Sequence, residues 1–160
     1  MKIIIASDHA GLELRQELVA SLRERGVGFD DVGPATRDSV DYPDFATKVA
    51  RAVAAGQYTH GVLVCGTGIG MSIVANKYRG VRAALCTTEF EARMARAHND
   101  ANVLCVGQRV IGAGVGRGIL EVFLATPFEG GRHEKRVQKI REAESQQGES
   151  HGEHPHARRG

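Results

Sequence analysis

The sequence predicts an α/β domain, a Rossmann-like three-layer α/β/α sandwich with a five-stranded parallel sheet and a C-terminal helix. Short apolar runs rich in β-branched residues alternate with longer segments of helical periodicity over most of the 160 residues. Short links join these segments, which is typical of parallel strands connected by right-handed crossovers through helices on both faces of a sheet. A chain of this length can form one substantial core.

The first half of the chain shows this alternation from its first residues. Residues 2–6 have the pattern of a buried strand, and residues 10–25 place their leucines on one helix face and end at Gly26, a usual position for a helix-terminating glycine. Residues 27–32 form a weaker strand pattern, and residues 44–55 form a second amphipathic helix pattern. The first half therefore contains two strands, each followed by a helix.

The second half repeats the pattern. Thr88 followed by Glu91 three residues later is typical of a capping box, which marks the start of a helix. The further strands are predicted at 61–65, 81–86 and 102–106, and the further helices at 68–78, 88–97, 112–125 and 131–147.

The composition excludes several classes of function. A formal net charge of +2 is too small for non-specific electrostatic binding to a polyanion, which argues against nucleic acid or an anionic membrane as a partner. No segment approaches the roughly 20 apolar residues of a membrane span, and residues 1–9 do not form a cleavable leader, so we expect a cytoplasmic protein. Large apolar residues end before Gly148, so the domain is predicted over 1–147 and a disordered tail over 148–160.

The most informative motif is a strand that ends in the thiol of Cys65 and enters a helix through three alternate glycines, Gly66, Gly68 and Gly70. The backbone N–H groups of such a turn can bind an anion or stabilise a developing oxyanion. The same field favours a thiolate, which can act as a base or nucleophile. A dinucleotide fingerprint fits less well because the third glycine comes one residue early, whereas a purely structural turn around a buried cysteine stays open.

Two polar clusters accompany the cysteine motif. Asp8 and His9 come directly after the first strand, at the sheet edge where ligands of such folds bind, and a carboxylate beside an imidazole can move protons there. Asp8 can equally cap the following helix. His98 and Asn99 follow the fourth predicted helix, whose negative end would keep the imidazole available for proton transfer, although an ordinary surface histidine fits the same position.

Three arginines and a tyrosine are further candidates for substrate binding. Arg132 and Arg136 lie four residues apart, so two guanidinium groups on one helix face can converge on a phosphate, although a solvated charged face is the ordinary explanation. Arg109 follows the fifth strand and is another anion candidate. Tyr42 precedes Pro43, which predicts a ring presented from a loop or, alternatively, simple packing at the entry to a helix.

Six ordered motifs run through the chain between Met1 and about Gln147, and with them the chain resembles the type B ribose-5-phosphate isomerases. The wider family includes the galactose-6-phosphate isomerase subunits of the lactose pathway. The cysteine motif resembles the branch that uses a cysteine base rather than the branch that uses a glutamate. The motifs are Ser7-Asp8-His9-Ala10-Gly11, Asp41-Tyr42-Pro43, Cys65-Gly66-Thr67-Gly68-Ile69-Gly70-Met71-Ser72, Ala75-Asn76-Lys77, His98-Asn99-Asp100-Ala101-Asn102-Val103 and Gly130-Gly131-Arg132-His133.

This resemblance implies that D-ribose 5-phosphate and D-ribulose 5-phosphate interconvert through an enediolate, in the non-oxidative pentose phosphate pathway, without a metal or organic cofactor. It implies that Cys65 moves a proton between C2 and C1, that Thr67 and His98 assist ring opening, and that Asp8 lies beside the sugar hydroxyls and shares in proton movement. The substrate-binding residues that it implies are Gly66, Gly68, Ile69 and Gly70 at the enediolate oxygen, His9, Arg132 and Arg136 at the phosphate, and Tyr42, Asn99 and Arg109 around the rest of the pocket.

The resemblance also implies a homodimer, or a dimer of two such dimers, with the active site shared between subunits. In that arrangement the cysteine motif of one subunit faces the His98-Asn99 segment and the arginines of the other. The apolar helix surface between Ile111 and Phe123 fits a dimer, but it can equally be buried against its own sheet. Two other functions stay open: isomerisation of a hexose phosphate such as allose or galactose 6-phosphate, and a sugar-phosphate-binding module without turnover.

Overall fold

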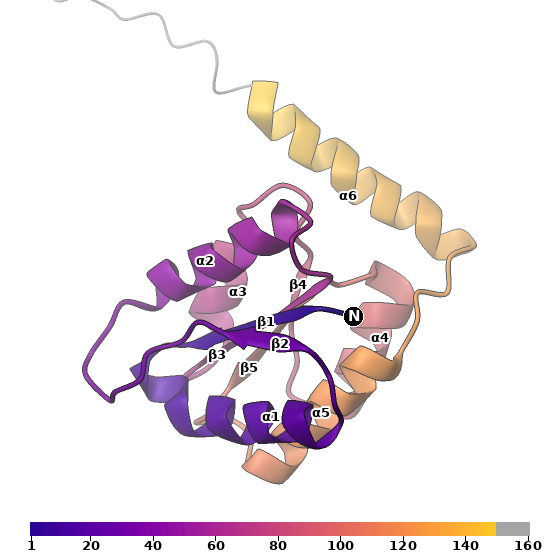
Figure 1. Cartoon of the computed structure of the whole chain (residues 1–160). Coiled ribbons are helices and arrows are strands. Elements are labelled where there is room, and N and C mark those ends of the chain that lie inside the picture. Colours follow the sequence, from indigo (N-terminus) through magenta and orange to yellow (C-terminus); the bar gives the residue numbers. More distant parts are fainter. Residues whose placement is uncertain (150–160) are drawn as a thin grey trace, which may run out of the picture.

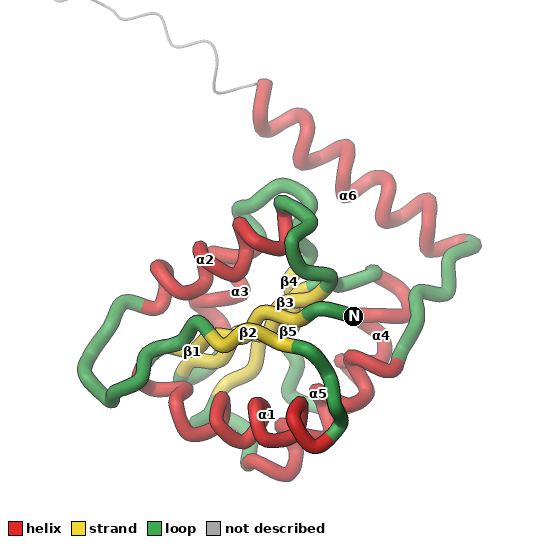
Figure 2. The backbone as a smooth tube through the Cα atoms, viewed as in Figure 1, coloured by secondary structure: helices red, strands yellow, loops and turns green. Residues whose placement is uncertain are grey.

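A computed structural model describes residues 1–149 of the chain and shows a central sheet between helices (Figures 1 and 2). The strands form one sheet in the order β2-β1-β3-β5-β4, and every neighbouring pair is parallel. The predicted five-stranded parallel sheet is therefore confirmed. The strands are β1 (Ile3–Ser7), β2 (Phe29–Asp31), β3 (His60–Cys65), β4 (Ala83–Leu85) and β5 (Val103–Gly107).

Two helical layers cover the sheet, because each strand alternates its apolar side chains between the two faces. On one face, α1, α4 and α5 pack over a core that includes Leu18, Leu104 and Phe123. On the other face, α2 and α3 pack over a core that includes Val49 and Met71. The helices are α1 (Leu12–Glu24, preceded by a 3₁₀ turn, His9–Gly11), α2 (Tyr42–Ala54), α3 (Ile69–Ala75), α4 (Glu89–Asn99), α5 (Ala113–Ala125) and α6 (Arg132–Glu149).

The start of α4 has the predicted capping box. The Thr88 hydroxyl accepts a 3.2 Å hydrogen bond from the backbone N–H of Glu91, and the Glu91 carboxylate accepts a 3.1 Å bond from the N–H of Thr88. The backbone of Asp100, at φ 46°, ends the helix, and its carboxylate pairs with Arg82 and Arg96 at 2.8 and 3.0 Å. The capping box thus fixes the start of α4, and the ion pairs of Asp100 fix its end.

Two predicted boundaries are wrong in ways that concern candidate site residues. Tyr42 is the first residue of α2 rather than a loop residue, because Pro43 lacks only an N–H that the first turn of a helix leaves unpaired. His98 and Asn99 are the last two residues of α4 rather than residues that follow it. The remaining differences are shifts of a few residues at element ends, the largest in the shorter β2, α3 and β4.

The apolar side of α5 is largely used within the subunit. Ile119 and Phe123 are fully buried against the subunit's own sheet, so they do not support a dimer surface, whereas Val115 is 48% exposed. Gly116 and Gly118 allow this packing. A Cβ atom at Gly116 would come within 2.8 Å of Leu14 in α1, and one at Gly118 would come within 2.3 Å of Glu89 in α4. The glycine spacing of α5 therefore serves helix packing inside one subunit.

Helix α6 extends past the edge of the globular part (Figure 1). Its first turns attach it to the rest of the domain through the buried side chains of His133 and Val137. It continues to Glu149, two residues past the predicted domain boundary at 147, while the tail prediction for 150–160 lies outside the described residues. Within residues 1–149, no helix is both long enough and apolar enough to cross a membrane.

Candidate active site

The cysteine loop, residues 65–70, lies at the carboxyl end of the central strands. Cys65 is the last residue of β3, where it pairs in register with Gly107 of β5, and it is 5% exposed. The loop is tied to the turn after β5, since the carbonyls of Cys65 and Gly66 each accept a 2.9 Å hydrogen bond from backbone N–H groups of Gln108 and Arg109. The thiol is thus held on a rigid part of the sheet edge.

Gly68 closes the loop around the thiol. Its backbone N–H donates a 3.0 Å hydrogen bond to the Cys65 sulfur, and its φ of +78° is a left-handed conformation that favours glycine. A Cβ atom here would approach Leu85 to 2.5 Å and the backbone carbon of Val106 to 3.0 Å. Thr67, which precedes Gly68, accepts a 3.4 Å hydrogen bond on its hydroxyl from the N–H of Ile69, the first residue of α3.

Asp8 and His9 lie at the same sheet edge, as predicted. The backbone N–H of Asp8 donates to the carbonyl of Val64, the residue before the cysteine loop, at 3.2 Å. The Asp8 side chain is buried and accepts a 3.0 Å hydrogen bond from the N–H of Gly11, so it does cap the 3₁₀ turn. His9 Nδ1 accepts a 3.2 Å hydrogen bond from Val40, which leaves Nε2 available to a ligand.

Tyr42 and Arg109 complete this part of the site. The Tyr42 ring packs against Gly70, since a Cβ atom there would come within 2.7 Å of the ring carbons. The Arg109 side chain runs beside Gly66, with its guanidinium carbon 3.6 Å from the position of a Cβ atom. We name these residues, Asp8, His9, Tyr42, 65–70 and Arg109, the carboxyl-edge group.

The other two cysteines, Cys86 and Cys105, are core residues. Cys86 is 1% exposed and Cys105 is fully buried. Burial raises the pKa of Cys86 to about 12 and raises the pKa of Cys105 as well, so both stay protonated near neutral pH. Cys65 is the thiol that lies at the edge of the sheet beside polar candidates.

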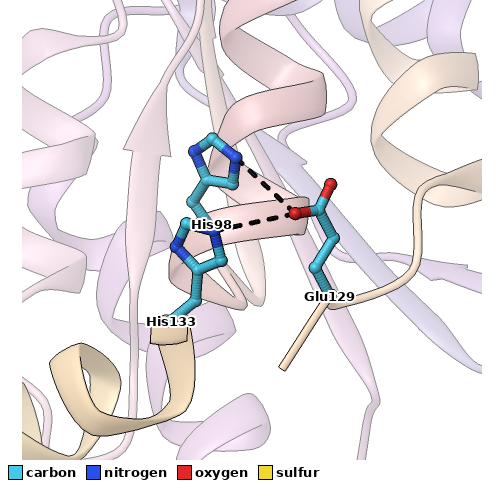
Figure 3. Close-up of side chains that lie close together, drawn as sticks. All are labelled: His98, Glu129 and His133. Carbon is cyan, nitrogen blue, oxygen red and sulfur yellow. Dashed lines mark ion pairs between the residues drawn. The ribbon is translucent and has the colours of Figure 1, made fainter. Parts of the chain in front are cut away.

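His98 and Asn99 lie at the opposite edge of the sheet, where α4 leads into the amino end of β5. The carbonyl of Asn99 accepts a 3.1 Å hydrogen bond from the Arg82 side chain, and Asn99 lines a hollow of about 420 Å³ between α6 and the β4 edge. His98 stacks on His133 of α6, with ring centroids 4.1 Å apart and planes within 7° (Figure 3). Both imidazoles face Glu129 in the loop before α6.

The two predicted arginines stand on the first turns of α6, near this histidine pair. Arg132 is exposed and its Nε–H donates to His133 Nε2 at 3.4 Å, while Arg136 is exposed one turn later. We name His98, Asn99, Arg132 and Arg136 the amino-edge group.

Within one chain the predicted site residues therefore form two separate groups. Gly61 of β3 pairs with Val103 at the amino edge and Cys65 pairs with Gly107 at the carboxyl edge, and four steps along a strand span about 13 Å. A single pentose phosphate cannot contact the full carboxyl-edge group and the full amino-edge group of the same subunit across the sheet.

Two side chains near His98 were not predicted from the sequence. His133 lies in the Gly130-Gly131-Arg132-His133 motif, but its sequence position indicates no role, and Glu129 lies in a loop without periodicity. The Gly130-Gly131 pair, with both residues at positive φ, is the signal that marks a tight turn here and could have drawn attention to both.

The comparisons with known proteins decide the family. A model of the family described as Ribose/Galactose Isomerase matches residues 3–140. The chain belongs to this family. Its relatives include the ribose-5-phosphate isomerase B of Escherichia coli, which is 46% identical over 139 residues, covering 87% of this chain and 93% of the relative.

Solved members of the ribose/galactose isomerase family share the fold. The ribose-5-phosphate isomerase B of Clostridium thermocellum superposes with a TM-score of 0.90 at 49% identity, covering 92% of this chain and 99% of that one. The isomerase B of Mycoplasma genitalium, solved with bound ribulose 5-phosphate, gives a TM-score of 0.87 at 42% identity and covers 90% and 96% of the two chains. The predicted family and its three-layer fold are both confirmed.

Proposed function

We propose that this chain is a ribose-5-phosphate isomerase, which interconverts D-ribose 5-phosphate and D-ribulose 5-phosphate through an enediolate. The observation that carries the proposal is the Cys65 thiol at the end of β3, hydrogen-bonded by the glycine loop that follows it. Isomerisation needs a base beside the carbonyl-bearing carbons and fixed donors for the oxygen that becomes negative. The names of the relatives in E. coli and C. thermocellum support this choice of substrate.

In the proposed reaction, the Cys65 thiolate removes the proton from C2 of the open-chain aldose. The electron pair moves toward C1 and the carbonyl oxygen becomes the enediolate oxygen, which the backbone N–H groups of Gly66, Gly68, Ile69 and Gly70 stabilise. The thiol then returns its proton to C1, while the C2 hydroxyl passes its proton to the negative C1 oxygen, so that C2 becomes the ketone and C1 carries the hydroxyl. Atoms and charge balance without an added redox partner.

Ring opening precedes this transfer, because ribose 5-phosphate exists mainly as a closed furanose. We assign it to Thr67 and His98, with buried Asp8 beside the sugar hydroxyls and sharing in proton movement. His9, Arg132 and Arg136 would hold the phosphate, and Tyr42, Asn99 and Arg109 would line the remaining pocket. Phosphate binding lies away from the reacting carbons and can therefore orient them.

The proposed active site is shared between two subunits of a homodimer, which can itself pair into a dimer of dimers. The separation of the carboxyl-edge and amino-edge groups within one chain supports this sharing, because each group alone lacks residues that the reaction needs. In a dimer, the carboxyl-edge group of one subunit would face the amino-edge group of its partner. Location in the cytoplasm stays a prediction from the sequence.

A parallel isomerase assay on ribose 5-phosphate, allose 6-phosphate and galactose 6-phosphate, each with and without a chelator, tests the proposed function. We expect turnover to be fastest with the pentose and undiminished by the chelator, because the proposed steps use only side-chain and backbone groups of the chain. Turnover of a hexose phosphate alone would contradict the proposed substrate. Binding without turnover on all three would show a sugar-phosphate-binding module instead.

A further inference from the structure

We propose that His98, Glu129 and His133 form a binding site for Zn²⁺, and that zinc bound there inhibits the enzyme. The three residues, named here the histidine cluster, offer two imidazole nitrogens and one carboxylate oxygen that all lie within 4.8 Å of one another. Two imidazoles and one carboxylate are a ligand set that zinc accepts, with a fourth position left for water. The inhibitory effect, though not the binding, rests on the proposed function.

Three different elements bring the cluster together. His98 comes from the last turn of α4, Glu129 from the loop before α6, and His133 from the first turn of α6 (Figure 3). The loop is anchored to α4 because the backbone N–H of Glu129 donates to the carbonyl of Ala97 at 3.0 Å, and the N–H of His133 donates to Gly130 at the same distance. The backbones of Glu129 and His133 are thus held close to the end of α4.

Both imidazoles turn a nitrogen toward the same carboxylate oxygen. Nε2 of His98 lies 3.8 Å from Glu129 Oε2, and Nε2 of His133 lies 3.6 Å from it. These distances are too long for direct hydrogen bonds, so neither imidazole uses its Nε2 to bond the carboxylate directly. Because the rings are stacked, a rotation of each about its χ2 angle is needed to direct both lone pairs at one ion.

His133 is in the chemical form that a metal requires. Its Nε2 accepts from the Arg132 Nε–H, so the lone pair is on Nε2, and its buried Nδ1 has no hydrogen-bond partner among the described residues. The His133 ring is only 4% exposed, and zinc at Nε2 would replace the Arg132 hydrogen bond with a metal bond.

Two cations oppose the ion and limit its affinity. Arg132 must release His133 Nε2 before zinc can bind, and Arg136 is close enough to affect the same imidazole. Arg132 is exposed and can turn into solvent, whereas Glu129 supplies one negative charge to the site. The balance favours a reversible site over a permanently occupied one.

Zinc at this site would inhibit isomerisation by occupying His98, to which we assign ring opening, and by displacing Arg132, to which we assign phosphate binding. Mg²⁺ should have no such effect, because it prefers oxygen ligands in an octahedral arrangement. The expected behaviour is inhibition by zinc that a chelator reverses.

The test measures metal binding directly in the full-length chain. Cys65 and the tail histidines can also bind zinc, so the starting protein carries Cys65→Ser, His151→Asn, His154→Asn and His156→Asn. Titration with Co²⁺, followed by its visible absorption, and competition between Zn²⁺ and a coloured chelator should both give one site per chain. Glu129→Gln and His133→Asn should each weaken zinc binding at least about tenfold.

Glu134→Gln is the matched control, because Glu134 is an exposed acid next to His133 that pairs with Arg141 and lies outside the cluster. Its zinc affinity should match that of the starting protein. Glu129→Gln changes an exposed side chain, so it keeps the test decisive if His133→Asn folds poorly. The proposed site would be overturned if neither substitution lowered the zinc affinity. It would also be overturned if the protein bound Mg²⁺ as tightly as Zn²⁺.

Activity is measured separately, in the chain with Cys65 intact and the tail histidines replaced. Loss of turnover on zinc addition, recovered with chelator and weakened by Glu129→Gln, supports the inhibitory role. Zinc bound at the cluster without loss of turnover would overturn that role. Absence of turnover in the metal-free protein would overturn the proposed isomerase function instead, while cluster-dependent binding would still support the zinc site.

Discussion

The sulfur of Cys65 accepts a 3.0 Å hydrogen bond from the backbone N–H of Gly68. Only two residues lie between Cys65 and Gly68 in the chain. The contact requires the left-handed conformation of Gly68 and the absence of a side chain there. It places the sulfur against the same backbone that we propose as the binding site of the enediolate oxygen. The base and the oxyanion donors are thus parts of one short turn.

Replacing the proposed base gives the first prediction. In Cys65→Ala, we expect kcat on ribose 5-phosphate to fall by about 100-fold to 10,000-fold, the usual contribution of a general base, while binding of the sugar phosphate persists. Steady-state kinetics and calorimetric binding measure the two effects. Cys86→Ala is the matched control, since it removes a buried thiol of the core and should leave kcat nearly unchanged. Near-normal kcat in Cys65→Ala would refute the role of this thiol.

The Gly68 turn gives a prediction of stability. Gly68→Ala places a side chain at φ +78° and drives its Cβ atom into Leu85 and the backbone of Val106. Gly80→Ala places one at φ +82° with nothing within 4 Å. Left-handed backbone strain should lower the free energy of unfolding by about 1–2 kcal/mol in both variants. The close contacts should lower it by a further ~1–3 kcal/mol in Gly68→Ala alone. Urea unfolding checks this, and equal losses in the two variants would show that the contacts do not matter.

The sequence was a good guide wherever local pattern decides structure. The strand that ends at Cys65 and the capping box of Thr88 and Glu91 follow from patterns within a few residues, and both are confirmed. The face of α5 shows the limit, because periodicity identifies Ile119 and Phe123 as one apolar side but does not say which surface covers it.

The candidate site was predictable in part. Residues that directly follow parallel strands share the carboxyl edge, so Asp8 and Cys65 could be grouped without a structure. The histidine cluster could not, because Glu129 has no pattern around it and its approach to His98 depends on where α6 docks. The position of Tyr42 was not decided by the sequence, because Pro43 disfavours helical backbone in the preceding residue but is itself tolerated in a first helical turn.

A half-buried imidazole, that of His60, predicts how stability depends on pH. Burial, helped by the charge of Arg96, lowers the pKa of His60 to about 4, whereas in the unfolded chain it is near 6.5. Between these values the folded state binds fewer protons than the unfolded state, so its stability is full above pH 6.5 and falls as the pH drops toward 4. His60→Asn should show a shallower fall over this window in urea unfolding at a series of pH values. Parallel curves for the two proteins would contradict the assignment.

The shared active site predicts complementation between two inactive variants. Cys65→Ala removes a residue of the carboxyl-edge group, and His98→Asn removes one of the amino-edge group. If each site combines one group from each subunit, random dimers of the two variants contain one intact site in every mixed dimer, so about a quarter of wild-type activity should return after co-refolding. Cys65→Ala mixed with Thr67→Ala is the matched control, because both changes lie in the carboxyl-edge group and no mixed dimer has an intact site. Recovery in neither mixture would show that each subunit carries its own complete site or that the groups do not meet. Equal recovery in the control would show that the gain does not come from sharing of the two groups.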